Sequence, residues 1–279
     1  VVIGGGTAGL EAACTAAEVG CNTFLLEKSN ELGGLASLIS KIPAKNRLAD
    51  FPHYLMHRAE QLDNLYIFKN TEGTPENIRK FHPNIIVSST GSAPLLPPIA
   101  GLKDRIDNEN HNIYSILGMI SHINDFPKDL EGKKVVVVGG GAVGLDVVEF
   151  FADRNADISI VEMMDQIGRD LDPVSKNDTK TMMKKHNVHQ LTKTALLEVK
   201  DSSFLVRGDG EPYELPFEYG FVCLGMRAQG QLYQNLTEEF SSEDVEIMNI
   251  GDSQRARRII DGTQEGRNIL TILEQKGYL

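Results

Sequence analysis

The stretch VIGGGTAGLE, residues 2–11, places three glycines after a short apolar run and before a segment rich in alanine and leucine. The same pattern returns as VVGGGAVGLD, residues 137–146. β-branched residues before a Gly-x-Gly-x-x-Gly turn, with helix-forming residues after it, predict a strand, a tight turn and a helix. The repeat therefore predicts an α/β fold with two similar βαβ units.

A second apolar segment follows each glycine turn and ends in glutamate. Residues 22–27 read NTFLLE, and residues 157–162 read DISIVE. In both copies the glutamate, Glu27 or Glu162, lies 23 residues after the first glycine, Gly4 or Gly139. A dinucleotide-binding unit places the carboxylate that binds the adenosine ribose at about this distance, roughly 20 residues on.

Two strand endings indicate how the units are joined. Residues 84–91 (NIIVSSTG) predict a strand that ends in a glycine turn before a proline-rich stretch, and residues 221–225 (FVCLG) repeat that ending. Residues 195–200 and 204–207 predict a hairpin, and residues 245–250 predict a strand before a helical run to Tyr278. We expect two Rossmann-like domains, the second inserted into the first. Residues 1–103 and 227–279 would form one domain, and residues 104–226 the other.

The glycines suit a pyrophosphate group. The first glycine permits the tight turn, the second lets the backbone approach the phosphates, and the third lets the helix pack on the strand. The helix N-terminus then presents free N–H groups and partial positive charge to the phosphates. The residues expected to bind the two dinucleotides are Gly4, Gly6, Gly9 and Glu27 in the first site and Gly139, Gly141, Gly144 and Glu162 in the second.

The second site is expected to prefer NADH over NADPH. A ribose 2′-phosphate would meet like charge at Glu162, and the next residues, Met163 and Met164, offer no arginine to bind it.

Composition excludes several other classes of protein. The net charge of -11, without a long run of one sign, argues against nucleic-acid binding, and no apolar stretch approaches the length of a membrane span. The three cysteines are too few and too scattered for a disulfide framework, a zinc site or an iron–sulfur cluster. The histidine pairs His53/His57 and His186/His189 have no third ligand at metal spacing. We expect a soluble, cytoplasmic protein with no bound metal.

The features above resemble flavoproteins with two dinucleotide-binding domains. The resemblance is carried by Glu27 with Leu32-Gly33-Gly34, Ser89-Thr90-Gly91 before Pro94, the second glycine turn, and Gly251-Asp252. It implies FAD in the first site, NAD(P)H in the inserted domain, and a bond from Asp252 to the flavin ribityl chain. The further cofactor contacts that it implies are Lys28, Gly33, Gly34, Thr90, Gly91, Gly251, Asp252, Arg258 and Ile259 for FAD and Gly225 for the nicotinamide dinucleotide.

A narrower resemblance is carried by Gly33-Gly34, by Ile42-Pro43-Ala44-Lys45, and by the tail from Gly251 through Arg257–Gly262 to Glu265-Gly266. These residues are similar to the C-terminal half of old yellow enzyme-like reductases, the group of 2,4-dienoyl-CoA reductase, trimethylamine dehydrogenase and NADH oxidase. In that group an N-terminal β/α barrel carries FMN, and a cysteine motif beside it binds a 4Fe-4S cluster. The chain also starts as if a strand were already under way. We therefore expect a reductase module whose partner is an FMN barrel of the same polypeptide, with homo-oligomers possible.

The chain departs from this family in two places. Thr7 stands where such sequences often have proline, a change that a helix start tolerates. Residues 253–256 replace a stretch that usually contains proline, so the flavin contacts there are open.

Hydride transfer remains as the expected chemistry once disulfide chemistry is excluded. Residues 33–46 contain no cysteine, and no Cys-x-x-Cys occurs, which argues against thioredoxin-reductase, disulfide-reductase and peroxidase mechanisms. Hydride transfer needs orientation and electrostatics rather than an acid or base, so no catalytic residue is assigned. A helix beginning after Asp252 is expected to direct its N-terminus at the flavin, assisted by Arg258. The alternative is that Arg255, Arg257 and Arg258 form a solvated basic patch.

Two other functions stay open. A nucleotide-binding structural module, as in trimethylamine dehydrogenase, would hold ADP and perform no chemistry. An electron-transfer module like the small subunit of glutamate synthase would share both glycine turns. The final electron acceptor is also open: a dienoyl thioester, another enone, an amine-derived electron pair or oxygen.

Overall fold

A computed structural model describes residues 1–278 of the chain, which divide into two compact units. The first unit contains residues 1–41, 45–93 and the chain from Arg227 onward, and the second contains residues 42–44 and 94–226. The second unit therefore interrupts the first in sequence. Each unit is built around a parallel sheet flanked by other layers, which confirms the expected α/β fold of two Rossmann-like units.

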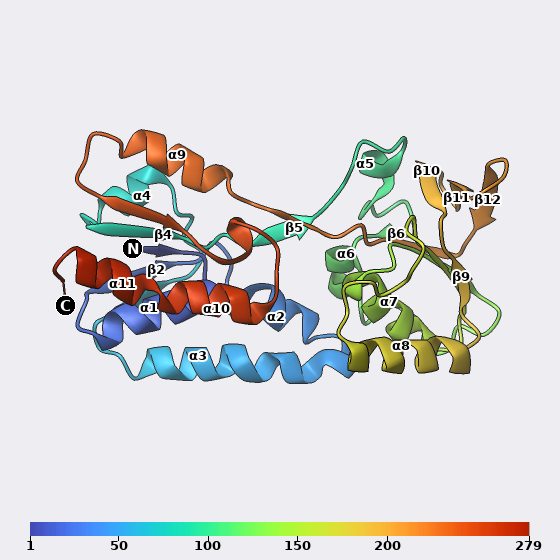
Figure 1. The fold of residues 1–279 in the computed structure, drawn as a ribbon, viewed down its shortest axis with the longest axis horizontal. Helices are drawn as coiled ribbons and strands as arrows, with labels where there is room; N and C mark the ends of the chain where they lie inside the picture. Colours follow the sequence, from blue (N-terminus) through green and yellow to red (C-terminus); the bar gives the residue numbers. More distant parts are fainter. Residues whose placement is uncertain (279) are drawn as a thin grey trace. The chain divides into compact units, whose positions relative to one another are not determined.

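The sheet of the first unit is parallel throughout (Figure 1). Its strands, in spatial order, are β15 (Glu246–Asn249), β4 (Ile85–Ser88), β1 (Val2–Ile3), β2 (Thr23–Leu26) and β3 (Leu65–Phe68). Because both faces are covered, a strand such as Ile85–Ser88 is buried at every position.

Two helical layers cover this sheet. One contains α1 (Thr7–Glu18), α3 (Asp50–Glu60), α10 (Ile259–Arg267) and α11 (Ile269–Gln275), and the other contains α4 (Pro75–Arg79) and α9 (Gln231–Glu239). Helix α10 packs along α1, although the two are far apart in sequence. The short helices α2 (Gly34–Ile39) and η1 (Pro43–Ala49) connect β2 to α3. This layering brings the C-terminal part of the chain to the first glycine turn.

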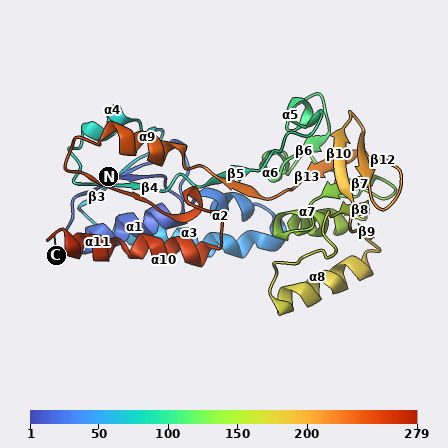
Figure 2. The same ribbon diagram turned by 45° about the horizontal axis from the view of Figure 1, so that its top comes forward.

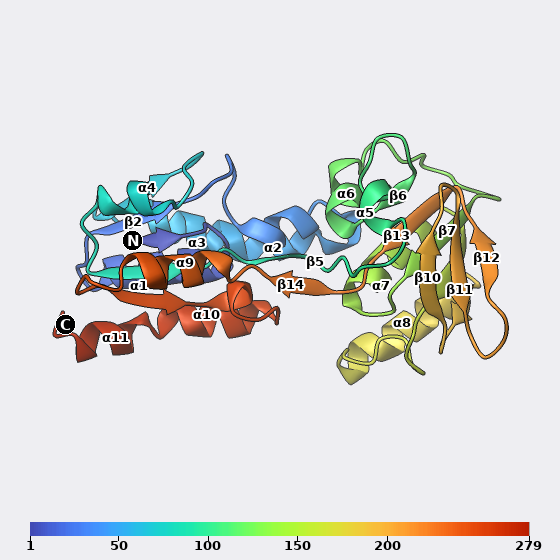
Figure 3. The same cartoon turned by 90° about the horizontal axis from the view of Figure 1, so that it is seen from above.

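The second unit repeats the parallel sheet with a different cover. Its strands, in spatial order, are β6 (Ile113–Tyr114), β13 (Tyr219–Val222), β7 (Lys134–Val138), β8 (Asp157–Val161) and β9 (His189–Leu191). Aromatic side chains from α7 (Ala142–Ala152), with Phe126, pack against β13 on one face. The antiparallel strands β10 (Ala195–Val199), β11 (Ser203–Arg207) and β12 (Tyr213–Pro216) pack on the other face (Figure 3). The expected hairpin is therefore present as β10 and β11.

The remaining helices of this unit are short or lie in connections. They are α5 (Leu102–Arg105), α6 (Ile116–Ser121) and α8 (Pro173–Lys185), of which α8 joins β8 to β9 (Figure 2). Helix α8 begins at Pro173 because Asp172 caps it, accepting the N–H groups of Val174 and Ser175.

The chain crosses between the units at β5 (Ser92–Pro94) and β14 (Met226–Ala228), which pair with each other. The first crossing lies between Ala93 and Pro94, earlier than the boundary at residues 103 and 104 that the proline-rich stretch suggests. The reason is that Leu96, Ile99 and Leu102 already pack in the core of the second unit. Within residues 1–278, no helix is long and apolar enough to cross a membrane.

Candidate dinucleotide-binding sites

The first glycine of each motif turns the chain out of its central strand. Gly4 follows β1 with φ 102°, and Gly139 follows β7 with φ 109°, a region that side chains rarely adopt. A Cβ atom at Gly4 would collide with the carbonyl of Ser89, and one at Gly139 with the carbonyl of Cys223. Each glycine turn therefore packs closely against the end of a neighbouring strand, at Ser89 in the first unit and at Cys223 in the second.

The other two glycines of each motif have opposite surroundings. A Cβ atom at Gly9 or Gly144 would overlap the carbonyl oxygen of Gly4 or Gly139, so these positions allow the helix to approach its strand. At Gly141 a Cβ atom would meet no protein atom within 4 Å, and at Gly6 it would reach only Gly34 Cα, at 4.0 Å. The middle glycine of each motif thus leaves open space beside the backbone, which fits the close approach of a pyrophosphate.

The two glutamates bind their own glycine turns in the same way. Glu27 Oε2 accepts the N–H of Gly5 at 2.7 Å, and Glu162 Oε2 accepts the N–H of Gly140 at 2.7 Å. The other oxygen accepts the N–H two residues further on, of Ser29 or Met164, also at 2.7 Å. A carboxylate retains further lone pairs, so ribose hydroxyls can still donate to it.

The repeat extends beyond the residues that the sequence motif marks. Gly33 donates its N–H to the carbonyl of Gly5 at 2.7 Å, and Gly168 donates to the carbonyl of Gly140 at 2.7 Å. Sequence reasoning assigned no role to Gly168. Gly168 follows Gly33 in the sequence by the same number of residues as Gly139 follows Gly4, and this equal spacing could have identified Gly168.

The helices that follow the turns have open N-termini. Helix α1 starts after Gly6 and α7 after Gly141, both without a side-chain cap and without an acidic residue in the first turn. Their first N–H groups and partial positive charge suit a phosphate. Together with the open space at the middle glycines, these helix starts fit FAD in one unit and a nicotinamide dinucleotide in the other.

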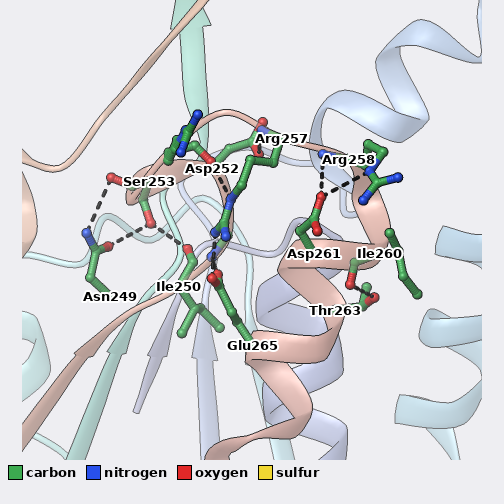
Figure 4. A network of polar contacts seen from close by, with 12 residues as sticks. Asn249, Ile250, Asp252, Ser253, Arg257, Arg258, Ile260, Asp261, Thr263 and Glu265 are labelled. Atoms are coloured by element: carbon green, nitrogen blue, oxygen red, sulfur yellow. Dashed lines mark hydrogen bonds and ion pairs between the residues drawn. The ribbon is translucent and has the colours of Figure 1, made fainter. Parts of the chain in front are cut away.

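The Gly251–Asp252 segment lies at the start of α1. A Cβ atom at Gly251 would lie 2.9 Å from Ala8 Cβ, so this turn is packed against the first helix. Asp252 Oδ2 accepts the hydroxyl of Ser92 at 3.1 Å. Asp252 Oδ1 accepts the N–H of Arg257 at 3.0 Å (Figure 4). Asp252 is thereby brought beside the first glycine turn.

The helix expected after Asp252 is present as α10, but a loop separates the two. Asp252 lies in a single 3-10 turn, η2 (Gly251–Ser253), and α10 begins at Ile259. The N–H of Arg257 is drawn back to the Asp252 carboxylate, which holds the intervening chain in a loop.

The three arginines of this loop differ from one another. Arg257 forms an ion pair with Glu265 at 2.6 Å, and its side chain is 28% exposed. The side chain of Arg258 is 83% exposed and pairs with Asp261 at 3.3 Å, across the first turn of α10. Arg255 is exposed. All three residues are exposed, as the solvated-patch alternative predicts, but Arg257 is also paired with Glu265.

The remaining expected cofactor contacts lie around these turns. Thr90 Oγ1 donates to the carbonyl of Gln229 at 2.7 Å. Gly91 and Gly225 have φ 75° and 103°, and a Cβ atom at either would face open space. Gly34 lies beside Gly6, whereas Lys28 and Ile259 are exposed.

The thiols are not arranged for redox chemistry. Cys14, Cys21 and Cys223 are all unpaired. Burial raises the pKa of the Cys14 thiol to about 11 and that of Cys223 to about 12, so both stay protonated at neutral pH. Within residues 1–278, no group of three or more His, Cys, Asp or Glu side chains is placed to hold a metal ion.

Glu11, for which the sequence suggested no chemistry, forms a buried ion pair. Its Oε2 lies 2.9 Å from Arg58 Nη1, and Arg58 Nε also binds Glu18 at 2.6 Å. These contacts tie α1 to α3, beneath the glycine turn, and serve the fold rather than a reaction.

Comparison with known proteins agrees with this geometry. The chain is 28% identical over 267 residues to the NADH oxidase of Thermoanaerobacter brockii, covering 95% of this chain and 39% of that protein. A 2-naphthoyl-CoA reductase complex has the same fold, with a TM-score of 0.80, 24% identity, and coverage of 96% of this chain and 39% of that one. Thioredoxin reductase of T. acidophilum superposes with a TM-score of 0.69 and 16% identity, over 100% of this chain and 98% of its own. The resemblance inferred from the sequence is thus confirmed.

The chain spans about two fifths of the length of the NADH oxidase, 39%. Residues 1–247 match the family described as pyridine nucleotide-disulphide oxidoreductase, whose members bind FAD and NAD(P)H. This match shows that the chain belongs to the pyridine nucleotide-disulphide oxidoreductase family.

Proposed function

We propose that the chain is an NADH-dependent flavin reductase module. The first unit holds FAD, the second holds NADH, and the module passes electrons onward to a further domain. The observation that carries this proposal is the repeated contact of Gly5 with Glu27 and of Gly140 with Glu162, each at 2.7 Å. Two preformed turns of the same geometry in one chain suit two dinucleotides.

Assignment of FAD to the first unit rests on Asp252. Its carboxylate is held by Ser92 and by the backbone of Arg257, beside the start of α1. A fixed carboxylate here can accept hydrogen bonds from the hydroxyls of a ribityl chain. ADP has no ribityl group and would not use this carboxylate.

Preference for NADH over NADPH in the second unit rests on Glu162 and its neighbours. Both Glu162 oxygens accept backbone N–H groups, so the carboxylate is fixed where a 2′-phosphate would approach. Met163 is 68% exposed and Met164 is 40% exposed, and neither can pair with that phosphate. Like-charge repulsion without a compensating cation disfavours NADPH.

The protein contributes binding and orientation. Bound FAD would accept a hydride from the nicotinamide of NADH, a step that needs no protein acid or base. The open helix starts of α1 and α7 bind the two pyrophosphates, and the two glutamates fix the adenosine ends. The thiols of Cys14 and Cys223 are kept protonated by burial and would take no part in this hydride transfer.

The relatives are much longer than this chain, which supports a further domain in the same polypeptide. The chain matches 39% of the NADH oxidase and 43% of the metal reductase of Desulforamulus reducens. We place an FMN barrel with a 4Fe-4S cluster in the same polypeptide as the partner that receives the electrons. Unpaired cysteines suit the reducing cytoplasm as the compartment.

The test is anaerobic reduction of the purified chain. The chain should be yellow, release FAD on denaturation, and lose its flavin absorbance when NADH is added. A protein that stays colourless after incubation with FAD would contradict the proposal. A chain that retains ADP instead would favour the structural module, and unchanged cofactor content in Asp252→Ala would remove the argument from the ribityl contact.

A further inference from the structure

Glu265 and Arg257 close a ring of contacts around the Gly251–Asp252 turn (Figure 4). Glu265 Oε2 accepts the N–H of Gly251 at 2.7 Å, and Glu265 Oε1 binds Arg257 Nη2 at 2.6 Å. Arg257 in turn donates its backbone N–H to Asp252 Oδ1 at 3.0 Å. The covalent link from Asp252 back to Gly251 completes the ring.

This ring is anchored to the first glycine turn through α10. Glu265 lies on α10 between Gly262 and Gly266, two positions at which this helix lies close to α1. A Cβ atom at Gly266 would lie 2.6 Å from the carbonyl oxygen of Ala8, and one at Gly262 would lie 3.3 Å from Ala8 Cβ. Because α10 is held so tightly to α1, the Glu265 carboxylate has a fixed position relative to the turn.

We propose that Glu265 and Arg257 are positioning residues that fix the Gly251 backbone and the Asp252 carboxylate for binding of the flavin. This inference rests on the proposed FAD site. Without Glu265, the N–H of Gly251 loses its acceptor, and the Arg257 guanidinium loses its carboxylate partner and keeps only the bond from Nε to the carbonyl of Arg255 at 3.2 Å. The residues from Gln254 to Arg258 would then no longer be held in place, and the bond from the N–H of Arg257 to Asp252 Oδ1 would be lost.

The geometry distinguishes this pair from an ordinary surface ion pair. The side chains of Arg257 and Glu265 are only 28% and 24% exposed, whereas the neighbouring Arg258 is 83% exposed. Both Glu265 oxygens are used, one for the backbone and one for the guanidinium, and such charge-assisted bonds are the stronger kind. A contact of this kind fixes direction as well as distance.

The experiment is a double-mutant cycle on FAD affinity in the whole chain. The variants are Glu265→Gln, Arg257→Met and the double variant, titrated as apoprotein with FAD and followed by flavin fluorescence. Both contacts of Glu265 are charge-assisted, so each single variant should raise the FAD Kd about tenfold. The FAD Kd of the double variant should equal that of the single variant with the lower FAD affinity. It should not rise by the product of the two single effects, because both changes break the same ring.

Two controls separate positioning from general stability. Glu274→Gln removes one negative charge from the exposed surface of α11 and should leave the FAD Kd unchanged. The FAD titrations are run at a temperature at which both apoproteins are folded, and the visible circular dichroism of bound FAD should change only in Glu265→Gln. If Glu265→Gln does not fold, Glu265→Asp and Arg257→Lys, which keep the charges but shift the contact atoms, enter the same cycle.

The outcomes are distinct. Wild-type chain that binds FAD together with an unchanged Kd in Glu265→Gln overturns the positioning role and leaves the flavin site intact. Multiplied effects in the double variant overturn the coupling of the two residues. Wild-type chain that binds no FAD overturns the flavin site and this inference with it.

Discussion

The N–H of Gly140 and the carboxylate of Glu162 are joined by a hydrogen bond of 2.7 Å, which repeats the bond between Gly5 and Glu27 in the first unit. The glutamate holds the glycine turn, and in the proposed function it also binds the adenosine ribose. Since the same device serves both units, changing it in one unit should affect one dinucleotide only.

Replacement of Glu162 by glutamine should weaken NADH binding and reduce the discrimination against NADPH. A glutamine side chain has only one acceptor oxygen for the two N–H groups of Gly140 and Met164, and it carries no charge to repel a 2′-phosphate. We expect the NADH concentration for half-maximal flavin reduction to rise about tenfold, as for loss of one charged hydrogen bond. Stopped-flow reduction with NADH and NADPH measures both effects.

The matched control is Glu27→Gln, which should lower FAD retention and leave the dependence on NADH concentration unchanged. The reverse result, with Glu162→Gln releasing FAD, would exchange the assignment of the two units.

Alanine at two glycines of the second turn should separate folding from binding. Gly144→Ala would place its Cβ atom on the carbonyl oxygen of Gly139, and we expect it to lower the free energy of unfolding by about 1–3 kcal/mol. Gly141→Ala meets no protein atom within 4 Å, so its stability should stay within about 0.5 kcal/mol of wild type. The methyl group would fill the space that the pyrophosphate needs, so NADH binding should be lost.

Urea unfolding and NADH titration of the two variants test this contrast. Normal NADH binding by a stable Gly141→Ala chain would mean that the pyrophosphate does not lie at this turn.

The salt bridge between Glu18 and Arg58 should make stability depend on acid pH. Hydrogen bonding to Arg58 holds the pKa of Glu18 below its ordinary value of 4.5. A depressed carboxyl pKa contributes stability that is present above the unfolded-state value and is lost as the pH falls through the lower, folded-state value. Wild type should therefore exceed Glu18→Gln in melting temperature at neutral pH, and the difference should shrink below pH 4.5.

Melting curves of both chains at several pH values measure this effect. The same substitution in an Arg58→Met background should show little pH-dependent difference. A difference that persists unchanged in strong acid would contradict the contribution of the ion pair.

Thiol labelling should distinguish the three cysteines. Burial raises the pKa of Cys14 to about 11 and of Cys223 to about 12, so neither supplies thiolate at neutral pH, whereas Cys21 is partly exposed. Iodoacetamide followed by mass spectrometry should modify Cys21 slowly in the native chain and all three cysteines after denaturation. The Cys21→Ser chain should keep its NADH-dependent flavin reduction. Loss of that reaction would reopen thiol chemistry.

Much of the fold could be predicted because it follows local patterns. The β-branched runs, the glycine turns and the glutamates recur at equal spacing, and each depends on backbone sterics within one βαβ unit. The helix after Asp252 could be predicted, but its start at Ile259 could not, because the bond from the N–H of Arg257 to the Asp252 carboxylate holds the residues between them in a loop.

Sequence alone therefore determined the two Rossmann-like units, their order, and the glycines and glutamates of each turn. These features depend on backbone sterics and on residue spacing within a short segment of the chain. Only the tertiary structure decided what covers the first turn. Packing of α10 on α1, with glycine at the points of contact, brings Asp252, Ser92 and Glu265 together from distant parts of the sequence. Residues so far apart meet only when the sheet is assembled, because burial of the helix faces sets which of them become neighbours.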